Sequence, residues 1–212
     1  MKNLSDFREE YNQGELWEAR MHDNPLHQFS GWMQEAIESG LPEPNAMILA
    51  TALCDGTPSA RIVLLKEVTS NGFVFFTNYE SRKGKEIAEN PHVALVFPWH
   101  PIERQVRVEG VIEKIPAEDS DAYFNSRPET SKLGAWVSPQ SKVLHSREEL
   151  DHLQQENERK FFGKPIHRPT HWGGYLIIPH LIEFWQGRPN RLHDRILYLK
   201  SGKNWKIQRL AP

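Results

Sequence analysis

Residues 46–66 read AMILATALCDGTPSARIVLLK, and this stretch decides the fold class. Two apolar runs, residues 46–53 and 59–66, flank the dipeptide Asp55-Gly56, which favours a tight turn. Short apolar runs bounded by turn residues are typical of β-strands. The stretch therefore predicts a hairpin of two antiparallel strands.

The same pattern continues outward along the chain. Further strands are expected at residues 73–78, 92–99, 104–112, 175–178, 182–186, 195–200 and 205–209. Asn24-Pro25 opens a helix that Gly40 closes, and other helices are expected at residues 81–90, 117–126, 132–137 and 146–161. Closely spaced strands with hairpin turns favour an antiparallel meander that closes into a barrel. The expected fold is mainly β with peripheral helices (α+β), with an N-terminal arm at residues 1–23 and a single domain at residues 24–212.

Composition and charge narrow the class of protein. The chain has 212 residues, a formal net charge of -2 and a single cysteine, Cys54. A slightly negative net charge argues against nucleic acid as the main partner. A single cysteine cannot form an internal disulfide. No apolar run is long enough to span a membrane, so the expected location is cytoplasmic. The sequence contains no glycine-rich phosphate loop and no Cys/His spacing for a metal, so no metal site is expected.

A basic cluster follows the apolar run at residues 182–186. If residues 191–198 form one strand, the side chains of Arg191, His193 and Arg195 lie on the same face of it. Two guanidinium groups beside an imidazole would lower its pKa, an arrangement that suits an anion site. A basic edge that protects against aggregation is the alternative interpretation.

Further cations lie at the ends of other elements. Strict alternation places Arg61 and Lys66 on opposite faces of their strand, and Arg82-Lys83 open a helix. Basic residues match the dipole of a helix N-terminus poorly, but they suit a bound anion there. Solvated charges at element ends are the alternative.

A second candidate anion site lies at residues 123–131. Tyr123 and Arg127 are one turn apart on a helix that Pro128 ends, and Ser131 can cap the next helix. A phenol, a guanidinium group, a hydroxyl and free helix N–H groups together predict a phosphate site. A helix corner with an ordinary cap explains the same residues without a ligand.

An ordered set of motifs identifies the sequence with a known family. The motifs are Arg61-Ile-Val-Leu-Leu-Lys66, Phe76-Thr-Asn78, Ser81-Arg-Lys83, Glu103-Arg-Gln105, Gly134-Ala-Trp-Val-Ser138, Glu183-Phe-Trp-Gln-Gly187, Arg191-Leu-His-Asp-Arg195 and Arg209-Leu-Ala-Pro212. Together they resemble the pyridoxine/pyridoxamine 5′-phosphate oxidases, flavin enzymes that make pyridoxal 5′-phosphate. The resemblance covers nearly the whole chain.

The resemblance implies an FMN-binding split β-barrel and a homodimer with sites shared between subunits. FMN would be held by Arg61, Ile62, Val63, Leu64, Leu65, Lys66, Phe76, Thr77, Arg82, Lys83, Gln105, Gln140, Ser141, Trp185 and Arg195. The substrate would be held by Arg8, Tyr11, Lys66, Tyr123, Arg127, Ser131, Arg191 and His193. Of these, Lys66, Tyr123, Arg127 and Ser131 would hold its phosphate, and the arm with Arg8 and Tyr11 would cover the site.

The implied reaction oxidises pyridoxamine or pyridoxine 5′-phosphate with O₂ and produces H₂O₂. His193 and Arg191 are the catalytic candidates, with roles in orientation and proton handling. Two alternatives are a related split-barrel flavin oxidase acting on another ring, as in phenazine biosynthesis, and a non-catalytic protein that binds flavin or pyridoxal phosphate.

Overall fold

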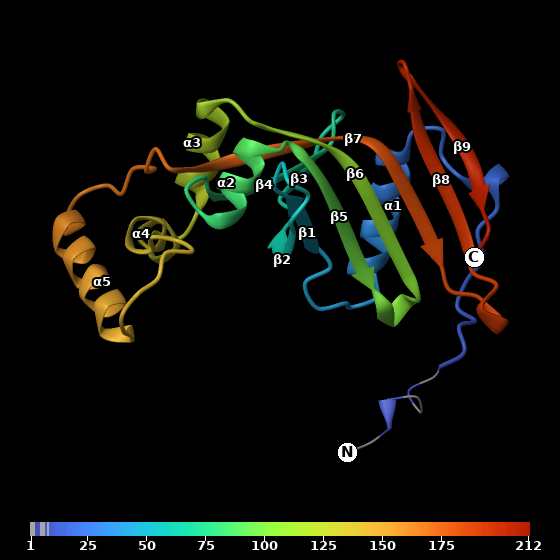
Figure 1. Cartoon of the computed structure of the whole chain (residues 1–212), viewed down its shortest axis with the longest axis horizontal. Coiled ribbons are helices and arrows are strands. Elements are labelled where there is room, and N and C mark those ends of the chain that lie inside the picture. The colour runs from blue at the N-terminus through green and yellow to red at the C-terminus, as the bar shows by residue number, and fades with distance from the viewer. Residues whose placement is uncertain (1–2, 5–6, 8) are drawn as a thin grey trace.

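The computed structural model describes residues 3–4, 7 and 9–212. Within these residues the strands form one antiparallel sheet in the order β2-β1-β5-β6-β7-β4-β3, and β8 and β9 continue from β7 (Figure 1). The strands are β1 (Ala46–Ala52), β2 (Pro58–Leu64), β3 (Glu67–Val68), β4 (Phe73–Asn78), β5 (His92–Trp99), β6 (Arg104–Lys114), β7 (Trp172–Gln186), β8 (Asp194–Ser201) and β9 (Asn204–Leu210).

β7 runs through both halves of the sheet. It pairs with β6 over residues 175–186, with β4 over residues 172–177 and with β8 over residues 181–186. The register with β6 shifts next to Gly110, which leaves His180 as an extra residue in β7. Gly110 is required there because a Cβ atom would collide with the backbone of Ile178. The two strands expected at residues 175–178 and 182–186 are therefore a single strand. Pro179 has no N–H group for the hydrogen-bonded ladder, and a bulge is a position where a strand tolerates proline.

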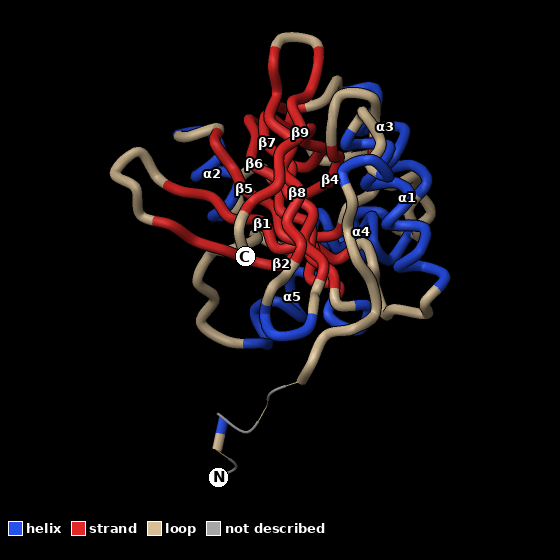
Figure 2. The backbone as a smooth tube through the Cα atoms, turned by 90° about the vertical axis from the view of Figure 1, so that its right-hand side faces the viewer, coloured by secondary structure: helices blue, strands red, loops and turns tan. Residues whose placement is uncertain are grey.

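The sheet curls into a half-barrel around the hydrophobic core. β2, at one end of the strand order, comes into contact with β4 near the other end. α1 (Pro25–Glu38) begins at Asn24, whose side chain accepts a hydrogen bond from Leu26 N, and it buries Phe29 and Trp32 in the core. Figure 2 shows the strands together in the middle of the molecule with helices around them.

The remaining helices lie mainly at one end of the sheet. They are α2 (Arg82–Glu89), α3 (Ala117–Ser126), α4 (Glu129–Val137) and α5 (Arg147–Phe161), with short 3₁₀ turns η2 (Glu18–Arg20), η3 (His100–Ile102) and η4 (Pro189–Arg191). α3, α4 and α5 follow one another beyond the start of β7, whereas β8 and β9 lie at the opposite end (Figure 1). Across the described part of the chain, no helix combines the length and the apolar character that a membrane crossing requires.

The expected fold class is confirmed: the protein is mainly β, antiparallel, with peripheral helices in a split barrel. Besides the two strands that merge into β7, three local expectations were wrong. α4 begins at Glu129, because Pro128 takes the N-cap position, and the two-residue strand β3 was not expected. Arg191 ends a 3₁₀ turn and His193 precedes β8, so alternation along a strand does not place them.

Phe29 gives a test of the core. Its side chain is fully buried, and its ring centroid lies 4.9 Å from that of Phe73 and 4.7 Å from that of Phe97. Phe29→Ala leaves a cavity that these rings cannot fill, so we expect a loss of about 3–5 kcal/mol in the free energy of unfolding. Ile37→Ala on the exposed side of α1 should cost less than about 1 kcal/mol in the same denaturant titration. Equal losses in the two variants would contradict this packing.

Candidate functional site

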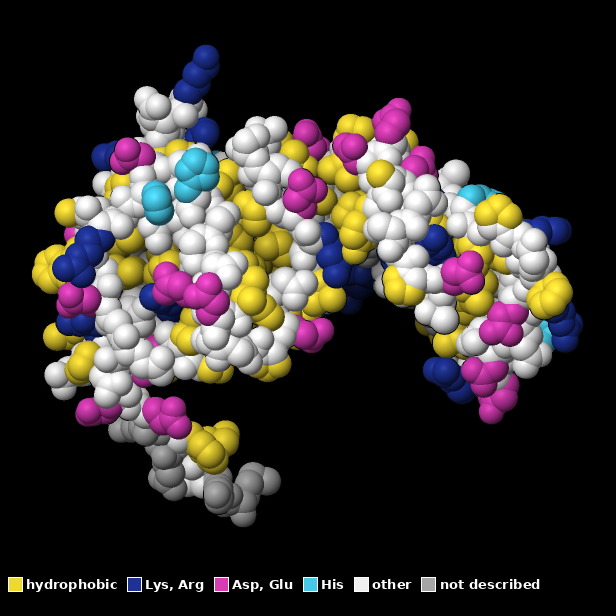
Figure 3. Space-filling view, turned by 180° about the vertical axis from the view of Figure 1, so that it is seen from behind, with side chains coloured by type: hydrophobic (Ala, Val, Ile, Leu, Met, Phe, Trp, Pro, Cys, Tyr) yellow, Lys and Arg dark blue, Asp and Glu magenta, His cyan; other side chains and the backbone are white. Residues whose placement is uncertain are grey.

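A cavity of about 510 Å³ opens where β2 and β4 face the corner between α3 and α4. We call it the cationic cavity, because Arg61, Lys66, Lys83 and Arg127 all line it. The other predicted site residues that line it are Ile62, Val63, Leu64, Phe76, Thr77, Tyr123, Ser131 and Gln140. Viewed from behind, the molecule is hollowed between the sheet and the helical end, and dark blue Lys and Arg side chains lie along this hollow (Figure 3).

Arg61 and Lys66 reach the same cavity, contrary to the expectation from strict alternation. β2 ends at Leu64, and Leu65 then turns into the core with 6% exposure. Lys66 N donates to Val74 O at 2.8 Å, which brings the chain back beside β4. Alternation applies only within a strand, so it does not separate these two cations. Leu65 is a predicted FMN residue whose side chain does not line the cavity.

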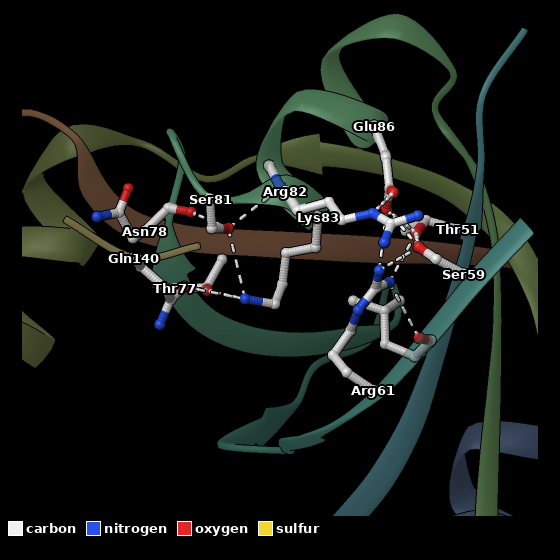
Figure 4. A network of polar contacts seen from close by, with 12 residues as sticks. Thr51, Ser59, Arg61, Thr77, Asn78, Ser81, Arg82, Lys83, Glu86 and Gln140 are labelled. Atoms are coloured by element: carbon white, nitrogen blue, oxygen red, sulfur yellow. Dashed lines mark hydrogen bonds and ion pairs between the residues drawn. The ribbon is translucent and has the colours of Figure 1, made fainter. Parts of the chain in front are cut away.

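Arg61 is held by a buried carboxylate from α2. Its guanidinium group donates to Glu86 Oε2 at 2.9 Å and to Thr51 Oγ1 at 2.6 Å, and it also bonds Ser59 (Figure 4). Glu86 is only 3% exposed. Burial alone would raise its pKa, but hydrogen bonds from Thr51, Ser59, Arg82 and Arg61 together lower the pKa to about 2. The carboxylate therefore stays ionised and keeps Arg61 in one orientation.

Arg82 and Lys83, in the first turn of α2, point in different directions. Lys83 Nζ donates to Gln140 Oε1 at 2.9 Å and to Thr77 Oγ1 at 3.3 Å, at the wall of the cavity. Burial, and then the charge of Arg61, lower the pKa of Lys83. Arg82 instead bonds Glu86 one turn along the helix, and its side chain is 64% exposed and does not line the cavity. Ser141 is exposed and also lies outside the lining.

Arg127 carries an unsatisfied donor. Its guanidinium carbon lies 4.6 Å from the ring centroid of Trp172, and burial lowers its pKa. Among the described residues, Arg127 Nη1 is the one buried side-chain N or O atom without a hydrogen-bond partner. An unpaired buried donor of a guanidinium group is costly, and an anion in the cavity would satisfy it.

Tyr123 and Ser131 complete this side of the cavity. The Tyr123 ring stacks on Phe76 with 3.8 Å between centroids. Ser131 was expected to cap the helix, but it lies in the first turn of α4, where its backbone N–H donates to Pro128 O at 2.9 Å. Its hydroxyl is therefore not used as a cap, and the residue still lines the cavity.

A second group of predicted residues lies across the far ends of β6, β7 and β8. Gln105 pairs with Trp185, and Trp185 pairs with Arg195, so the three form one row across the sheet. Arg195 donates from Nε to Glu183 Oε1 at 2.8 Å, and Glu183 is 3% exposed. This bond to Glu183 raises the pKa of Arg195 and fixes its direction.

His193 and Arg191 lie beside this row. The His193 ring centroid lies 4.7 Å from that of Trp185 and 5.6 Å from that of Tyr11. Burial, and then the charge of Arg191, lower the pKa of His193, whereas Arg195 is directed at Glu183. The pKa of His193 is therefore lowered, as expected, but the cause is burial and one guanidinium group rather than two flanking ones.

The protonation of His193 follows from a backbone contact. Arg188 N donates to His193 Nδ1 at 3.1 Å, and a backbone N–H can only donate. The neutral imidazole therefore carries its proton on Nε2. A cavity of about 410 Å³ lies here, lined in part by Tyr11, Arg191 and His193. Arg8, which was predicted to contact substrate, lies outside the described residues.

The two groups are far apart within one chain. Trp172 lines the cationic cavity and Trp185 belongs to the second group, and both are residues of β7. Trp185 follows Trp172 by thirteen positions in the strand, which corresponds to roughly 40 Å of extended chain before curvature. The structure therefore brings most of the predicted residues that it describes together in two clusters, and it does not join these clusters within a single chain.

Three buried carboxylates near these clusters were missed from the sequence: Glu86, Glu103 and Glu183. Glu86 follows Arg82 by four residues, a spacing that predicts a helical ion pair but not the contact with Arg61. Among the described residues no group of His, Cys, Asp and Glu side chains could hold a metal ion.

The fold and the cationic cavity define a split-barrel protein with a candidate site for an anion beside β2 and β4. Sequence models described as "Pyridoxamine 5′-phosphate oxidase" and "Pyridoxine 5′-phosphate oxidase C-terminal dimerisation region" match residues 33–152 and 172–212. The chain is 53% identical to the pyridoxine/pyridoxamine 5′-phosphate oxidase of Salinibacter ruber and 55% identical to that of Paraburkholderia phymatum, with 100% of each chain covered. The chain belongs to the pyridoxine/pyridoxamine 5′-phosphate oxidase family.

Solved structures agree with this fold. PhzG from Burkholderia lata 383, in complex with tetrahydrophenazine-1-carboxylic acid, matches with a TM-score of 0.87 at 28% identity over 93% of this chain and 98% of that chain. A pyridoxamine 5′-phosphate oxidase-related, FMN binding protein from Nostoc punctiforme matches with a TM-score of 0.71 at 16% identity, over 91% of this chain and 100% of that chain. Because the oxidases are far more similar in sequence than PhzG, the phenazine-type alternative is not favoured.

The network around Glu86 predicts a specific pH dependence. Its folded pKa of about 2 lies below the ordinary value of 4.5, so the carboxylate stabilises the fold above pH 4.5. That stabilisation, about 3 kcal/mol, is lost as the pH falls from 4.5 through 2. Glu86→Gln should lower the free energy of unfolding near pH 7 and flatten its fall across this window, measured by urea titration at fixed protein concentration.

The control is Glu80→Gln, which changes an exposed carboxylate just before the same helix. The free energy of unfolding of this variant should fall between pH 4.5 and pH 2 as much as that of the wild type. If Glu86→Gln also keeps that loss, the Arg61–Glu86 pair does not carry this stability.

Proposed function

We propose that the protein is an FMN-dependent oxidase that converts pyridoxamine 5′-phosphate and pyridoxine 5′-phosphate to pyridoxal 5′-phosphate, with O₂ as acceptor and H₂O₂ as product. Membership of a family of oxidoreductases with this name supports the reaction. The observation that carries the proposal is the cationic cavity, in which the buried Nη1 donor of Arg127 has no partner within the described chain. A phosphorylated substrate supplies the missing acceptor.

The residues of the chain suit FMN. The cofactor's phosphate would be held by Arg61 and Lys83, where Glu86 orients one cation and Gln140 contacts the other. Residues 61–66, Phe76 and Thr77 would line the rest of its site, and Gln105, Gln140, Ser141, Trp185 and Arg195 would contribute as the resemblance implies. The chemistry that FMN supplies when bound is a two-electron oxidation of the carbon that bears the amine or the alcohol, with transfer of both electrons to O₂.

The substrate phosphate would bind Lys66, Tyr123, Arg127 and Ser131. Its binding energy holds the reacting carbon in position, although the phosphate itself does not react. His193 would act as a neutral ring whose Nε2–H donates to a polar atom of the substrate ring, because its Nδ1 already accepts from Arg188 N. Burial, and then the charge of Arg191, lower the pKa of His193 and favour the neutral imidazole, and Arg191 would orient the substrate with it. The arm with Arg8 and Tyr11 would cover the ring.

A complete site would take residues from two copies of the chain. The Arg61–Lys83 cluster and the Trp185–His193 cluster lie at opposite ends of β7. A homodimer could join the first cluster of one copy to the second cluster of the other. The match of residues 172–212 to a region described as a dimerisation region supports this arrangement.

Arg127 tests the assignment of the substrate phosphate. Purified wild type should be yellow and should consume O₂ with pyridoxamine 5′-phosphate while it produces equimolar H₂O₂. Arg127→Ala removes one charge-assisted contact, so KM for this substrate should rise about 10- to 100-fold. The flavin content, read from visible absorbance, should stay near that of the wild type.

Arg147→Ala is the matched control, because Arg147 lies on the exposed face of α5 and pairs only with Asp151. It should leave KM unchanged. Loss of flavin from Arg127→Ala with an unchanged KM would mean that Arg127 holds the cofactor phosphate instead. Wild type that binds no flavin, or that does not oxidise this substrate, would refute the proposed function.

Complementation tests the shared site. Lys83→Ala removes a residue of the first cluster and His193→Ala a residue of the second, so each variant alone should be inactive. When the two variants are co-expressed, random pairing gives half heterodimers with one intact site of two, so about 25% of wild-type activity should return. A site built within one chain would give no recovery, as would two variants from the same cluster, Lys83→Ala with Arg61→Ala.

A further inference from the structure

The N-terminal chain crosses the ends of the strands that carry the second cluster. We call residues 11–16 the strap; in Figure 1 this part of the chain, in blue, rises beside the ends of β7 and β8. Its close fit is visible at Gly14, where an added Cβ atom would lie 3.0 Å from the Gln186 side chain. The strap brings Tyr11 against Trp185 and His193, with ring centroids 5.8 and 5.6 Å apart.

Glu103 fastens the upstream end of this strap. Its Oε2 atom accepts two consecutive backbone N–H groups, from Asn12 at 2.8 Å and from Gln13 at 2.9 Å. These donors are the two residues that follow Tyr11, so the contact sets where the Tyr11 ring lies. A carboxylate suits this position because charge-assisted bonds to backbone N–H groups are stronger than neutral ones.

Glu103 is itself held tightly in place. It is 8% exposed, and its φ of 54° lies in the left-handed region, which is uncommon for a residue other than glycine. Its carbonyl oxygen accepts Gly187 N at 2.7 Å and Gln186 Nε2 at 3.2 Å. The residue thus joins the start of β6 and the end of β7 to the strap.

Gly187 shows how closely these parts approach one another. A Cβ atom at this position would lie 2.7 Å from Tyr11 Cβ and 3.1 Å from Glu103 Cβ. The Tyr11 side chain therefore packs directly against Gly187, the residue after β7, and the Glu103 side chain also approaches this glycine. This contact leaves little freedom for the ring of Tyr11 as long as Glu103 holds the strap.

We propose that Glu103 is a positioning residue for the reaction, which acts by clamping the strap so that Tyr11 closes the site beside Trp185 and His193. The proposal rests on the proposed function, because it takes the second cluster to be part of the substrate site. Glu103 itself touches neither substrate nor cofactor in this proposal. No titration of the carboxylate is needed, only its two accepted hydrogen bonds.

The strap has a second anchor that does not depend on Glu103. Leu16 N donates to Asp194 Oδ2 at 3.0 Å, and Arg209 Nη2 donates to Leu16 O at 2.7 Å. Loss of the Glu103 side chain should therefore release the residues before Gly14 and leave the attachment at Leu16. This division makes the proposal testable in a protein that still folds.

Hydrogen exchange tests the clamp directly. In Glu103→Ala holoenzyme the amides of Asn12 and Gln13 should exchange at least about tenfold faster, whereas the amide of Leu16 keeps its wild-type rate. Glu103→Gln keeps an acceptor oxygen and should give an intermediate rate. Glu109→Ala, which removes a half-exposed carboxylate from β6, the strand that follows Glu103, should leave all three rates unchanged. Unchanged exchange at Asn12 and Gln13 in Glu103→Ala would overturn the proposal.

A double-mutant cycle tests the catalytic consequence. Glu103→Ala should lower kcat/KM for pyridoxamine 5′-phosphate about tenfold with normal flavin content, and Tyr11→Ala should do the same. If Glu103 acts through Tyr11, adding Glu103→Ala to Tyr11→Ala should lower kcat/KM by less than about twofold more. A purely structural role would instead give independent, multiplying losses, and that outcome overturns the proposal.

Hydrogen exchange and the double-mutant cycle together distinguish failure of this inference from failure of the proposed function. An active wild type with multiplying losses refutes the role of Glu103 and leaves the proposed function standing. A wild type without activity toward pyridoxamine 5′-phosphate refutes the proposed function, and the positioning role falls with it. In that case fast exchange in Glu103→Ala would still identify the contact with the strap.

Discussion

Continuous hydrogen bonding along β7 is the constraint on which the rest of the structure depends. β7 pairs with β6 over residues 175–186 while β4 and β8 share its other edge. The bulge at His180, opposite Gly110, lets one strand serve both parts without a break in the ladder. Because Trp172 and Trp185 lie on the same strand, β7 also sets the separation of the two clusters of site residues.

Buried carboxylates give each cluster its geometry. Glu86 holds Arg61, Glu183 holds Arg195, and Glu103 holds the chain that carries Tyr11. An arginine or a backbone segment at a protein surface has many accessible orientations, and fixing it by a buried carboxyl acceptor removes that freedom before a ligand arrives. The buried carboxyl groups are tolerated because each is paired with hydrogen-bond donors.

Arg127 differs from these residues in an informative way. It is packed between aromatic rings, yet its Nη1 has no acceptor within the described chain. The cations with carboxylate partners gain orientation, whereas Arg127 keeps a donor free for a ligand. This contrast is the physical basis for separating the residue proposed to bind the substrate phosphate from those proposed to bind the cofactor.

Local sequence determined most of the elements and many of the site residues. Asp55-Gly56 predicted the first hairpin and Asn24 predicted the start of α1, because turns and caps depend on near neighbours. The predicted helical spacing of Tyr123 and Arg127 was wrong, because α3 ends at Ser126 and Arg127 has an extended backbone, although both residues line the cationic cavity. Tertiary structure alone decided the rest. Arg61 and Lys66 meet because the chain turns after Leu64, and Gln105 joins Trp185 because strands distant in sequence pair in one register. The clamp of Glu103 on Asn12 and Gln13 joins residues about ninety positions apart, a contact that no local pattern encodes.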